Sequence, residues 1–173
     1  MNPVDASKSA TVVRAALGFG SNLGDRRNHI AQAAATVAAS PGVTLVATSP
    51  LFDTAPMGGP EQPDYLNAVA VIDTTLSARE LLELAQRCER DAGRTRGVRW
   101  GPRTLDVDVL AFDAVVSDDP ELTLPHPRAT ERAFVMVPWA AIDPSFVVSG
   151  RSVANWAEQL GHAGVTPLSE GRA

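Results

Sequence analysis

The order of strand-like and helix-like segments constrains the fold of this chain more than any other feature of its sequence. Strand-like patterns cover residues 12–19, 43–49, 65–75 and 104–112. One helical pattern separates the first two, and another, which opens with the capping-box residues Ser77 and Glu80, separates the last two. This β-α-β-β-α-β order predicts an α+β fold with a ferredoxin-like core, in which helices pack on an antiparallel sheet.

The remaining segments predict one domain with an added C-terminal part. Residues 115–124 favour a short hairpin, and residues 130–142 favour a helix with an internal proline. Residues 152–160 predict a last short helix, so the core should carry an extra C-terminal helical segment. The polar start, residues 1–11, predicts a disordered tail, and residues 12–173 should then form a single domain.

Composition excludes several classes of protein. The 173 residues are 45% hydrophobic and 20% charged, as in an ordinary globular domain, and no apolar run approaches membrane-spanning length. The net charge of -5 argues against wholesale nucleic-acid binding. Cys88, the only cysteine, cannot form an internal disulfide, and its apolar helical setting predicts a buried thiol rather than a nucleophile. We expect a cytoplasmic monomer.

The triplet Asp106-Val107-Asp108 is the most informative candidate site. On a strand both carboxylates point to one face, while Leu105, Val107 and Val109 pack on the other. Two like charges this close repel, so protonation, arginines or a hard cation must neutralise them. Magnesium prefers oxygen ligands and normally brings substrate phosphates with it. A polar strand edge facing water is the simpler alternative for such a pair.

Arginines cluster directly before this pair. The cluster comprises Arg87, Arg90, Arg94, Arg96, Arg99 and Arg103, while Lys8 is the only lysine. A solvated helix face followed by a loop would explain it, and so would a structural ion-pair network. Because the planar guanidinium grips phosphate bidentately, the arginines beside paired acids favour a polyphosphate–metal site. No Gly-x-x-x-x-Gly-Lys-Ser/Thr motif exists, so a P-loop enzyme is excluded.

Four groups of residues together resemble a known enzyme family. They are Gly18-Phe19-Gly20-Ser21-Asn22-Leu23, Gln62-Pro63-Asp64-Tyr65-Leu66-Asn67, the stretch 99–108, and Leu124-Pro125-His126 with Arg132-Ala133-Phe134. In this order and spacing they resemble the 6-hydroxymethyl-7,8-dihydropterin pyrophosphokinase family, from about Ala16 to Pro144. The resemblance implies transfer of pyrophosphate from ATP to the pterin hydroxymethyl group in folate biosynthesis.

The resemblance also implies roles for individual residues. Two Mg²⁺ ions would bind Asp106 and Asp108, and the catalytic set would comprise Arg94, Arg103, Asp106 and Asp108. Pterin-binding positions fall on Gly20, Thr54, Met57, Tyr65, Asn67, Trp100 and Phe134. ATP-binding positions fall on Gln86, Glu89, Arg96, Arg99, Trp100, Arg103, Val109, Thr123, His126 and Arg132.

Several of these residues also have an ordinary structural explanation. Tyr65 and Phe134, whose rings would suit a flat heteroaromatic ligand, could simply pack in the core. Glu89 could be a solvated helix residue. The chain also departs from the family pattern, with Glu121 where a basic residue can contribute to nucleotide binding and Pro127 where an aromatic residue can follow the histidine.

The implied reaction is direct attack of the hydroxymethyl oxygen on the β-phosphorus of ATP, with AMP as the leaving group. The loops 55–64 and 94–102 are candidates for lids that exclude water. A non-enzymatic ferredoxin-like module that binds a small ligand would explain the fold but not the paired aspartates beside arginines. A metal-dependent nucleotidyltransferase on nucleic acid would need a basic groove, which the net charge of -5 disfavours.

Overall fold

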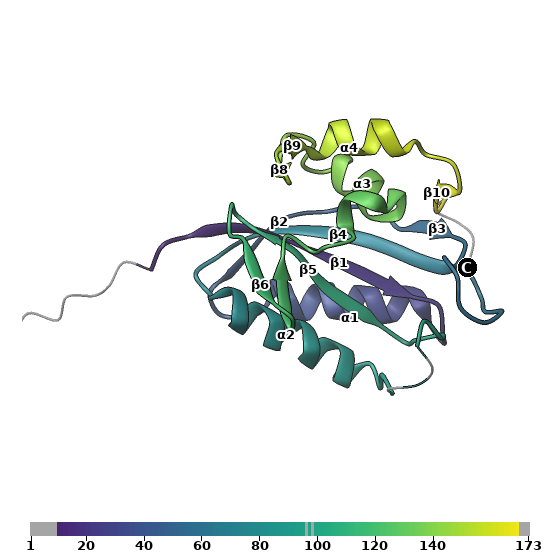
Figure 1. The fold of residues 1–173 in the computed structure, drawn as a ribbon. Coiled ribbons are helices and arrows are strands. Elements are labelled where there is room, and N and C mark those ends of the chain that lie inside the picture. Colours follow the sequence, from purple (N-terminus) through teal and green to yellow (C-terminus); the bar gives the residue numbers. More distant parts are fainter. Residues whose placement is uncertain (1–9, 96, 98, 170–173) are drawn as a thin grey trace, which may run out of the picture.

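A six-stranded antiparallel sheet forms the centre of the protein, in a computed structural model that describes residues 10–95, 97 and 99–169 (Figure 1). Its strands are β1 (Val13–Ser21), β2 (Val43–Thr48), β3 (Phe52–Thr54), β4 (Tyr65–Thr74), β5 (Asp106–Phe112) and β10 (Val165–Pro167). The strand order is β10-β3-β4-β1-β5, and β2 pairs with β4 beside β3. The mixed α/β architecture with an antiparallel sheet is therefore as the sequence predicts.

Strand β4 pairs with two different strands along one of its edges, one near each end. β2 pairs with residues 70–74 and β3 with residues 65–67. Ser49 lies between the two partners and closes the gap, because its hydroxyl accepts a hydrogen bond from the amide of Val69 at 2.9 Å. The amide of Ser49 in turn donates to the carbonyl of Val69 at 2.8 Å. The ladder therefore continues across the break.

Helices α1 (Arg26–Ala38) and α2 (Ala78–Asp91) cover one face of the sheet (Figure 1). Asp25 caps α1 by accepting from the amide of Asn28 at 3.1 Å. The capping box of α2 is confirmed: the Ser77 hydroxyl accepts from the Glu80 amide, and the Glu80 carboxylate accepts from the Ser77 amide. Both helices begin where local side chains satisfy their free amides.

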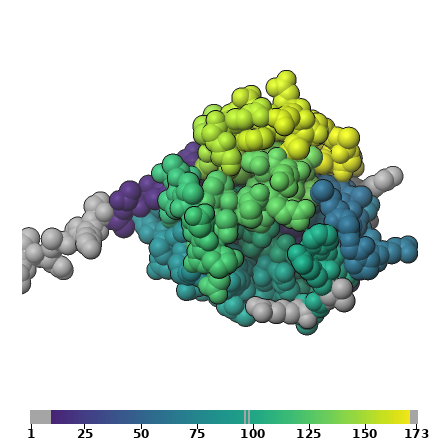
Figure 2. Space-filling view, in the orientation of Figure 1, coloured from purple at the N-terminus to yellow at the C-terminus, as the bar shows by residue number. Residues whose placement is uncertain are grey.

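The opposite face carries α3 (Ala133–Ala140) and α4 (Val153–Leu160), with the small hairpin of β8 (Val147–Val148) and β9 (Arg151–Ser152) (Figure 1). In the space-filling view the yellow C-terminal segment lies over the green α3 region (Figure 2). A second hairpin, β6 (Ser117–Asp119) and β7 (Leu122–Leu124), lies beside β5. The expected C-terminal helical segment thus forms a third layer.

Side-chain alternation divides the core in two. From β5, Val107 and Val109 join the cluster under α1 and α2, whereas Leu110 joins the cluster under α3 and α4. Asp106 and Asp108 consequently point toward the α3 side, as the alternation of a strand requires. Within the described residues, no helix is long and apolar enough to cross a membrane.

Some expected elements differ in the structure. The helix expected over 130–142 is a 3-10 turn, η1 (Ala129–Glu131), followed by α3, because Arg132 is extended between them. Pro138 lies inside α3 without ending it. Strand β10 was not expected, since its three residues carry no pattern of their own and pair with the distant β3. Most of the expected tail lies outside the described residues.

Candidate active site

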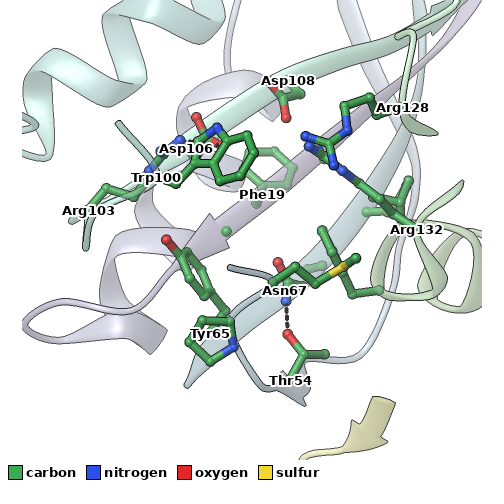
Figure 3. A pocket seen from close by; sticks show the side chains of 18 of the residues that line it. Phe19, Thr54, Tyr65, Asn67, Trp100, Arg103, Asp106, Asp108, Arg128 and Arg132 are labelled. Carbon is green, nitrogen blue, oxygen red and sulfur yellow. Dashed lines mark hydrogen bonds and ion pairs between the residues drawn. The ribbon is translucent and has the colours of Figure 1, made fainter. Parts of the chain in front are cut away.

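A cavity of about 400 Å³ opens at the end of the sheet on the α3 side, where the third layer leaves the strands uncovered (Figure 3). Two sides of it differ in character. Figure 3 shows Asp106, Asp108 and Trp100 on one side and Thr54, Tyr65 and Asn67 on the other. The predicted site residues that line the cavity are Gly20, Thr54, Met57, Tyr65, Asn67, Arg94, Trp100, Arg103, Asp106, Asp108, His126, Arg132 and Phe134.

The register of the three central strands builds the floor of this cavity. Gly20 on β1 lies opposite Asn67 on β4 and opposite Asp106 on β5. A Cβ atom at Gly20 would lie 3.1 Å from the amide oxygen of Asn67, closer than most such contacts. A larger residue there would push Asn67 aside. The glycine therefore leaves room for the amide and the carboxylate to face the same space.

Asp106 lies in a network of charged side chains. Arg94 Nη1 is 2.7 Å from Asp106 Oδ1, and Arg103 Nη1 is 3.1 Å from Asp106 Oδ2. Glu89, from α2, contacts Arg94 and accepts the Val107 amide proton at 2.9 Å. Burial raises the pKa of Glu89, and the Val107 amide opposes that effect. Glu89 thus supports Arg94 and the start of β5 from behind the cavity.

Asp108 has no arginine as close as those around Asp106. Its side chain is 36% exposed, and its nearest cationic candidate is His126, whose Nε2 is 3.8 Å from Asp108 Oδ2. Desolvation, with the charge of Asp106 next, raises the pKa of Asp108 to about 7. Desolvation and then Arg132 lower the pKa of His126, so neutral imidazole predominates at pH 7. Asp108 is therefore less closely neutralised by protein groups than Asp106.

The orientation of His126 is set by the next turn. The amide of Arg128 donates to His126 Nδ1 at 3.2 Å, so in the neutral ring the proton is on Nε2. That N–H faces Asp108 across the cavity. The peptide bond between Leu124 and Pro125 is cis.

The other side of the cavity suits a flat, polar ring. Asn67 is 7% exposed, and its amide donates to the Thr54 hydroxyl at 2.5 Å, which leaves its oxygen toward Gly20. Tyr65 is half-buried, and desolvation raises the pKa of its hydroxyl. Phe134 lines the cavity at the start of α3 with the Arg132 guanidinium 5.5 Å from its ring centroid. Both aromatic rings therefore border the cavity and are not packed entirely within the core.

The rim joins two loops far apart in sequence. The amide of Gln62 donates to the carbonyl of Trp100 at 2.9 Å, and its oxygen accepts from Asn22 at 3.0 Å. Gly59 has a φ of 82°, and a Cβ there would lie 2.5 Å from the Trp100 carbonyl oxygen. Trp100 itself has a φ of 62° and is 46% exposed. The contact between the loops thus depends on a glycine and a strained tryptophan.

A second cavity of about 610 Å³ lies between the end of α2 and the loop that follows it. The predicted residues that line it are Gln86, Glu89, Arg94, Arg99, Trp100 and Arg103. Val109 and Thr123 line neither cavity: Val109 packs under the helices, and the Thr123 hydroxyl donates to the Asp119 carbonyl. Arg96 lies outside the described residues. The residues expected to contact ATP are thus spread over both cavities.

The carboxylate pair fits a magnesium site that is completed by a substrate. Within the described residues, no group of three or more His, Cys, Asp or Glu side chains is arranged to hold a metal. Asp106 and Asp108 offer oxygen ligands only, and both face the cavity. Magnesium usually takes one or two carboxylates and fills its other positions with water and phosphate oxygens. The shortage of neutralising groups around Asp108 agrees with such a cation.

Three residues of the site had no role assigned from the sequence. Asn22 and Gln62 stand in the anchor motifs, and their hydrogen bonds across the rim are long-range. Arg128 lines the main cavity, but it follows a proline in a turn and carries no local signal. Their roles depend on contacts between segments about 40 or more residues apart, or on a turn whose direction the sequence does not determine.

The sequence matches one protein family over most of its length. The match, described as 7,8-dihydro-6-hydroxymethylpterin-pyrophosphokinase (HPPK), covers residues 16–144. A Methylorubrum extorquens protein named 2-amino-4-hydroxy-6-hydroxymethyldihydropteridine pyrophosphokinase is 43% identical, covering 89% of this chain and 98% of that one. A Bacillus subtilis protein of the same name is 44% identical, covering 73% and 75%.

Solved structures share the fold. A crystal structure of Plasmodium falciparum HPPK-DHPS with pteroate has a TM-score of 0.68 at 12% identity, covering 88% of this chain but 44% of that longer one. The wild-type protein with pterin and p-hydroxybenzoate has a TM-score of 0.62 at 12% identity, covering 88% and 42%. The extent of the sequence match decides the identity: this chain belongs to the HPPK family and is an ATP-dependent pyrophosphokinase of folate biosynthesis.

Proposed function

We propose that the cavity holds both substrates, with the pterin on the side of Asn67 and the ATP polyphosphate on the side of Asp106 and Asp108. The Asn67 amide can pair with the polar edge of the pterin, and Tyr65 and Phe134 can pack on its ring. The observation that carries this proposal is the meeting of two carboxylates, several arginines and a ring-binding surface within one cavity of about 400 Å³.

The chain's own residues would align the reacting groups. Arg103 and Arg94 contact Asp106 directly and can hold phosphoryl oxygens beside it, while Arg132 adds positive charge near Asp108. Alignment of this kind can lower the activation free energy of a reaction between two bound groups by roughly 7–11 kcal/mol. Trp100 and the loop 55–64 would cover the cavity and exclude water. Cys88 is buried away from the cavity, and burial raises the pKa of its thiol, so it is not a nucleophile.

Asp106 and Asp108 would hold two Mg²⁺ ions together with ATP. When bound, the ions supply charge neutralisation for the phosphoryl oxygens and for both carboxylates. The remaining expected ATP contacts, including Gln86, Arg99 and His126, are part of the same proposal.

The finer description of the fold is also a proposal. The order β2-β4-β1-β5, with α1 and α2 as the two crossovers, supports a ferredoxin-like βαββαβ core. A monomeric, cytoplasmic enzyme that does not bind nucleic acid stays a prediction, which sedimentation and fractionation would test.

Magnesium-dependent formation of AMP from ATP, measured with and without 6-hydroxymethyl-7,8-dihydropterin, tests the proposal. We expect AMP only when both the pterin and Mg²⁺ are present. A protein that binds the pterin without forming AMP would instead be a binding module. AMP formation that persists in Asp106→Ala would contradict the assignment of the metal.

A further inference from the structure

Arg128 is a cavity residue outside the set that the family resemblance marks. It precedes η1, and its side chain lines the main cavity together with Asp108, His126 and Arg132. Figure 3 shows its guanidinium beside that of Arg132 and on the side of Asp108, away from Thr54 and Tyr65. The position of the side chain therefore matches the polyphosphate half of the cavity.

The charge of Arg128 is weakly compensated. Among the described residues, its carboxylate contact is with Glu131, at 4.0 Å from Nε, and the Glu131 side chain is 69% exposed. Such a surface pair contributes little. Arg94 and Arg103, in contrast, contact Asp106 at 2.7 Å and 3.1 Å. Arg128 thus presents a cation that Glu131 neutralises only weakly and that can bind an anion.

An aromatic ring holds this cation in place. The Trp100 ring has the Arg128 guanidinium 5.6 Å from its centroid and the Arg99 guanidinium 5.3 Å from it. Cation–π attraction of this kind holds a guanidinium over the ring and leaves its N–H groups available to an anion. Trp100 belongs to the loop 94–102 and Arg128 to the turn after β7, so this contact joins two loops that border the cavity.

We infer that Arg128 is a nucleotide-binding residue of this enzyme, which contacts the ATP polyphosphate opposite Arg103 while it stacks on Trp100. The inference rests on the proposed placement of the polyphosphate at Asp106 and Asp108. It gives this chain a basic group two residues after His126, next to Pro127, where the expected aromatic residue is absent.

The test measures by calorimetry how tightly α,β-methylene-ATP binds, in the presence of Mg²⁺, to the full-length wild type, Arg128→Ala and Arg128→Lys. The KM for ATP and the KM for the pterin are measured for the same three proteins. Loss of a charge-assisted contact should weaken nucleotide binding about 10-fold or more in Arg128→Ala. Arg128→Lys should recover part of that loss, since it keeps the charge without the planar fork. The KM for the pterin should not change.

Arg151→Ala is the matched control, because it removes a similar contact, Arg151 over the Trp156 ring at 4.5 Å, and Arg151 lines neither cavity. It should bind nucleotide like the wild type. Unchanged nucleotide affinity in Arg128→Ala, or a rise in the pterin KM alone, would overturn the inference. Asp106→Ala is measured in parallel. If Asp106→Ala keeps full turnover, the placement of the polyphosphate is wrong. If Asp106→Ala is inactive but Arg128→Ala binds the nucleotide normally, only the role of Arg128 is refuted.

Discussion

The two walls of the cavity are built in different ways. Paired strands carry one wall, where Gly20, Asn67 and Asp106 are fixed by continuous ladders across β4, β1 and β5. Loops carry the other, where Trp100 has a positive φ and is joined to Gln62 by a side-chain hydrogen bond. Strands position side chains rigidly, whereas loops can open and close at low cost.

This difference suggests a division of work between the walls. The strand wall holds the groups whose geometry must not change during transfer, namely the carboxylates and the amide. The loop wall holds groups that must leave for substrates to enter, such as Trp100. Substitutions on the strand wall should therefore reduce kcat, and substitutions on the loop wall should change KM more than kcat.

The largest effect should follow loss of a carboxylate on the strand wall. Asp106→Asn or Asp108→Asn keeps the shape of the side chain but removes a charge that would hold the metal and the polyphosphate. We expect kcat to fall about 1,000-fold in each, at saturating ATP and Mg²⁺. If kcat stayed close to that of the wild type, the strand wall would not have the catalytic role proposed for it.

The stability of Asp108→Asn, measured against pH, shows whether the variant loses activity without losing its fold. The folded pKa of Asp108, about 7, lies above the value of about 3.9 in an unfolded chain, so the folded state holds this proton more tightly. Wild-type stability therefore falls as pH rises from about 4 to about 7, and asparagine removes this term. In urea with a chelator, the variant should gain stability relative to the wild type over that window.

Arg103→Ala should have the next largest effect. Arg103 belongs with the strand wall, because its guanidinium contacts Asp106 and its backbone is hydrogen-bonded to Asn22 directly after β1. Its charge is needed as phosphoryl charge shifts during transfer. We expect kcat to fall about 100-fold while the KM for the pterin stays the same. Steady-state rates at several pterin concentrations measure this, and a change confined to the pterin KM would place Arg103 in the wrong half of the cavity.

Phe134→Ala should act on binding rather than on rate. Its ring faces the cavity at the start of α3, and loss of its contact with the pterin should raise the pterin KM about 10-fold. Calorimetry with the pterin checks this, and Phe134→Tyr should retain most of the affinity. An effect on ATP affinity alone would contradict a role in ring packing.

Gln62→Ala should have the smallest effect. It removes the hydrogen bond to the Trp100 carbonyl and one of the two bonds that the Asn22 amide donates, while that amide keeps its bond to the Pro63 carbonyl. The strand wall stays intact. One neutral hydrogen bond contributes about 1 kcal/mol, so the KM of both substrates should rise about fivefold with little change in kcat. A fall in kcat as large as that of Arg103→Ala would show that the rim takes part in the chemistry, and the two walls would no longer differ in function.

Sequence patterns predict the parts of this molecule that depend on local periodicity. The capping box at Ser77 and the shared face of Asp106 and Asp108 follow from the spacing of helix and strand residues, and the structure has both. The same strand alternation places Val109 with Val107 under the helices, although the family resemblance assigns Val109 to ATP. Alternation thus predicts the direction of the Val109 side chain, while a contact of Val109 with ATP stays a prediction.

Contacts between distant segments could not be predicted in this way. Arg79 forms ion pairs with Asp119 and with Glu121, the acid that replaces an expected basic group. That arrangement depends on how the β6-β7 hairpin lies beside α2. The stack of Arg128 on Trp100 likewise depends on two loops meeting, and strand β10 on a chain end that returns to β3.

Ser49 connects the edge of the sheet to the cavity in a further way. Val69, whose amide its hydroxyl satisfies, also lines the cavity. In Ser49→Ala that amide would lose its partner at the break between β2 and β3. We expect that amide to exchange with deuterium far faster than in the wild type. One hydroxyl at the edge of the sheet thus keeps closed a stretch of backbone whose side chain borders the cavity.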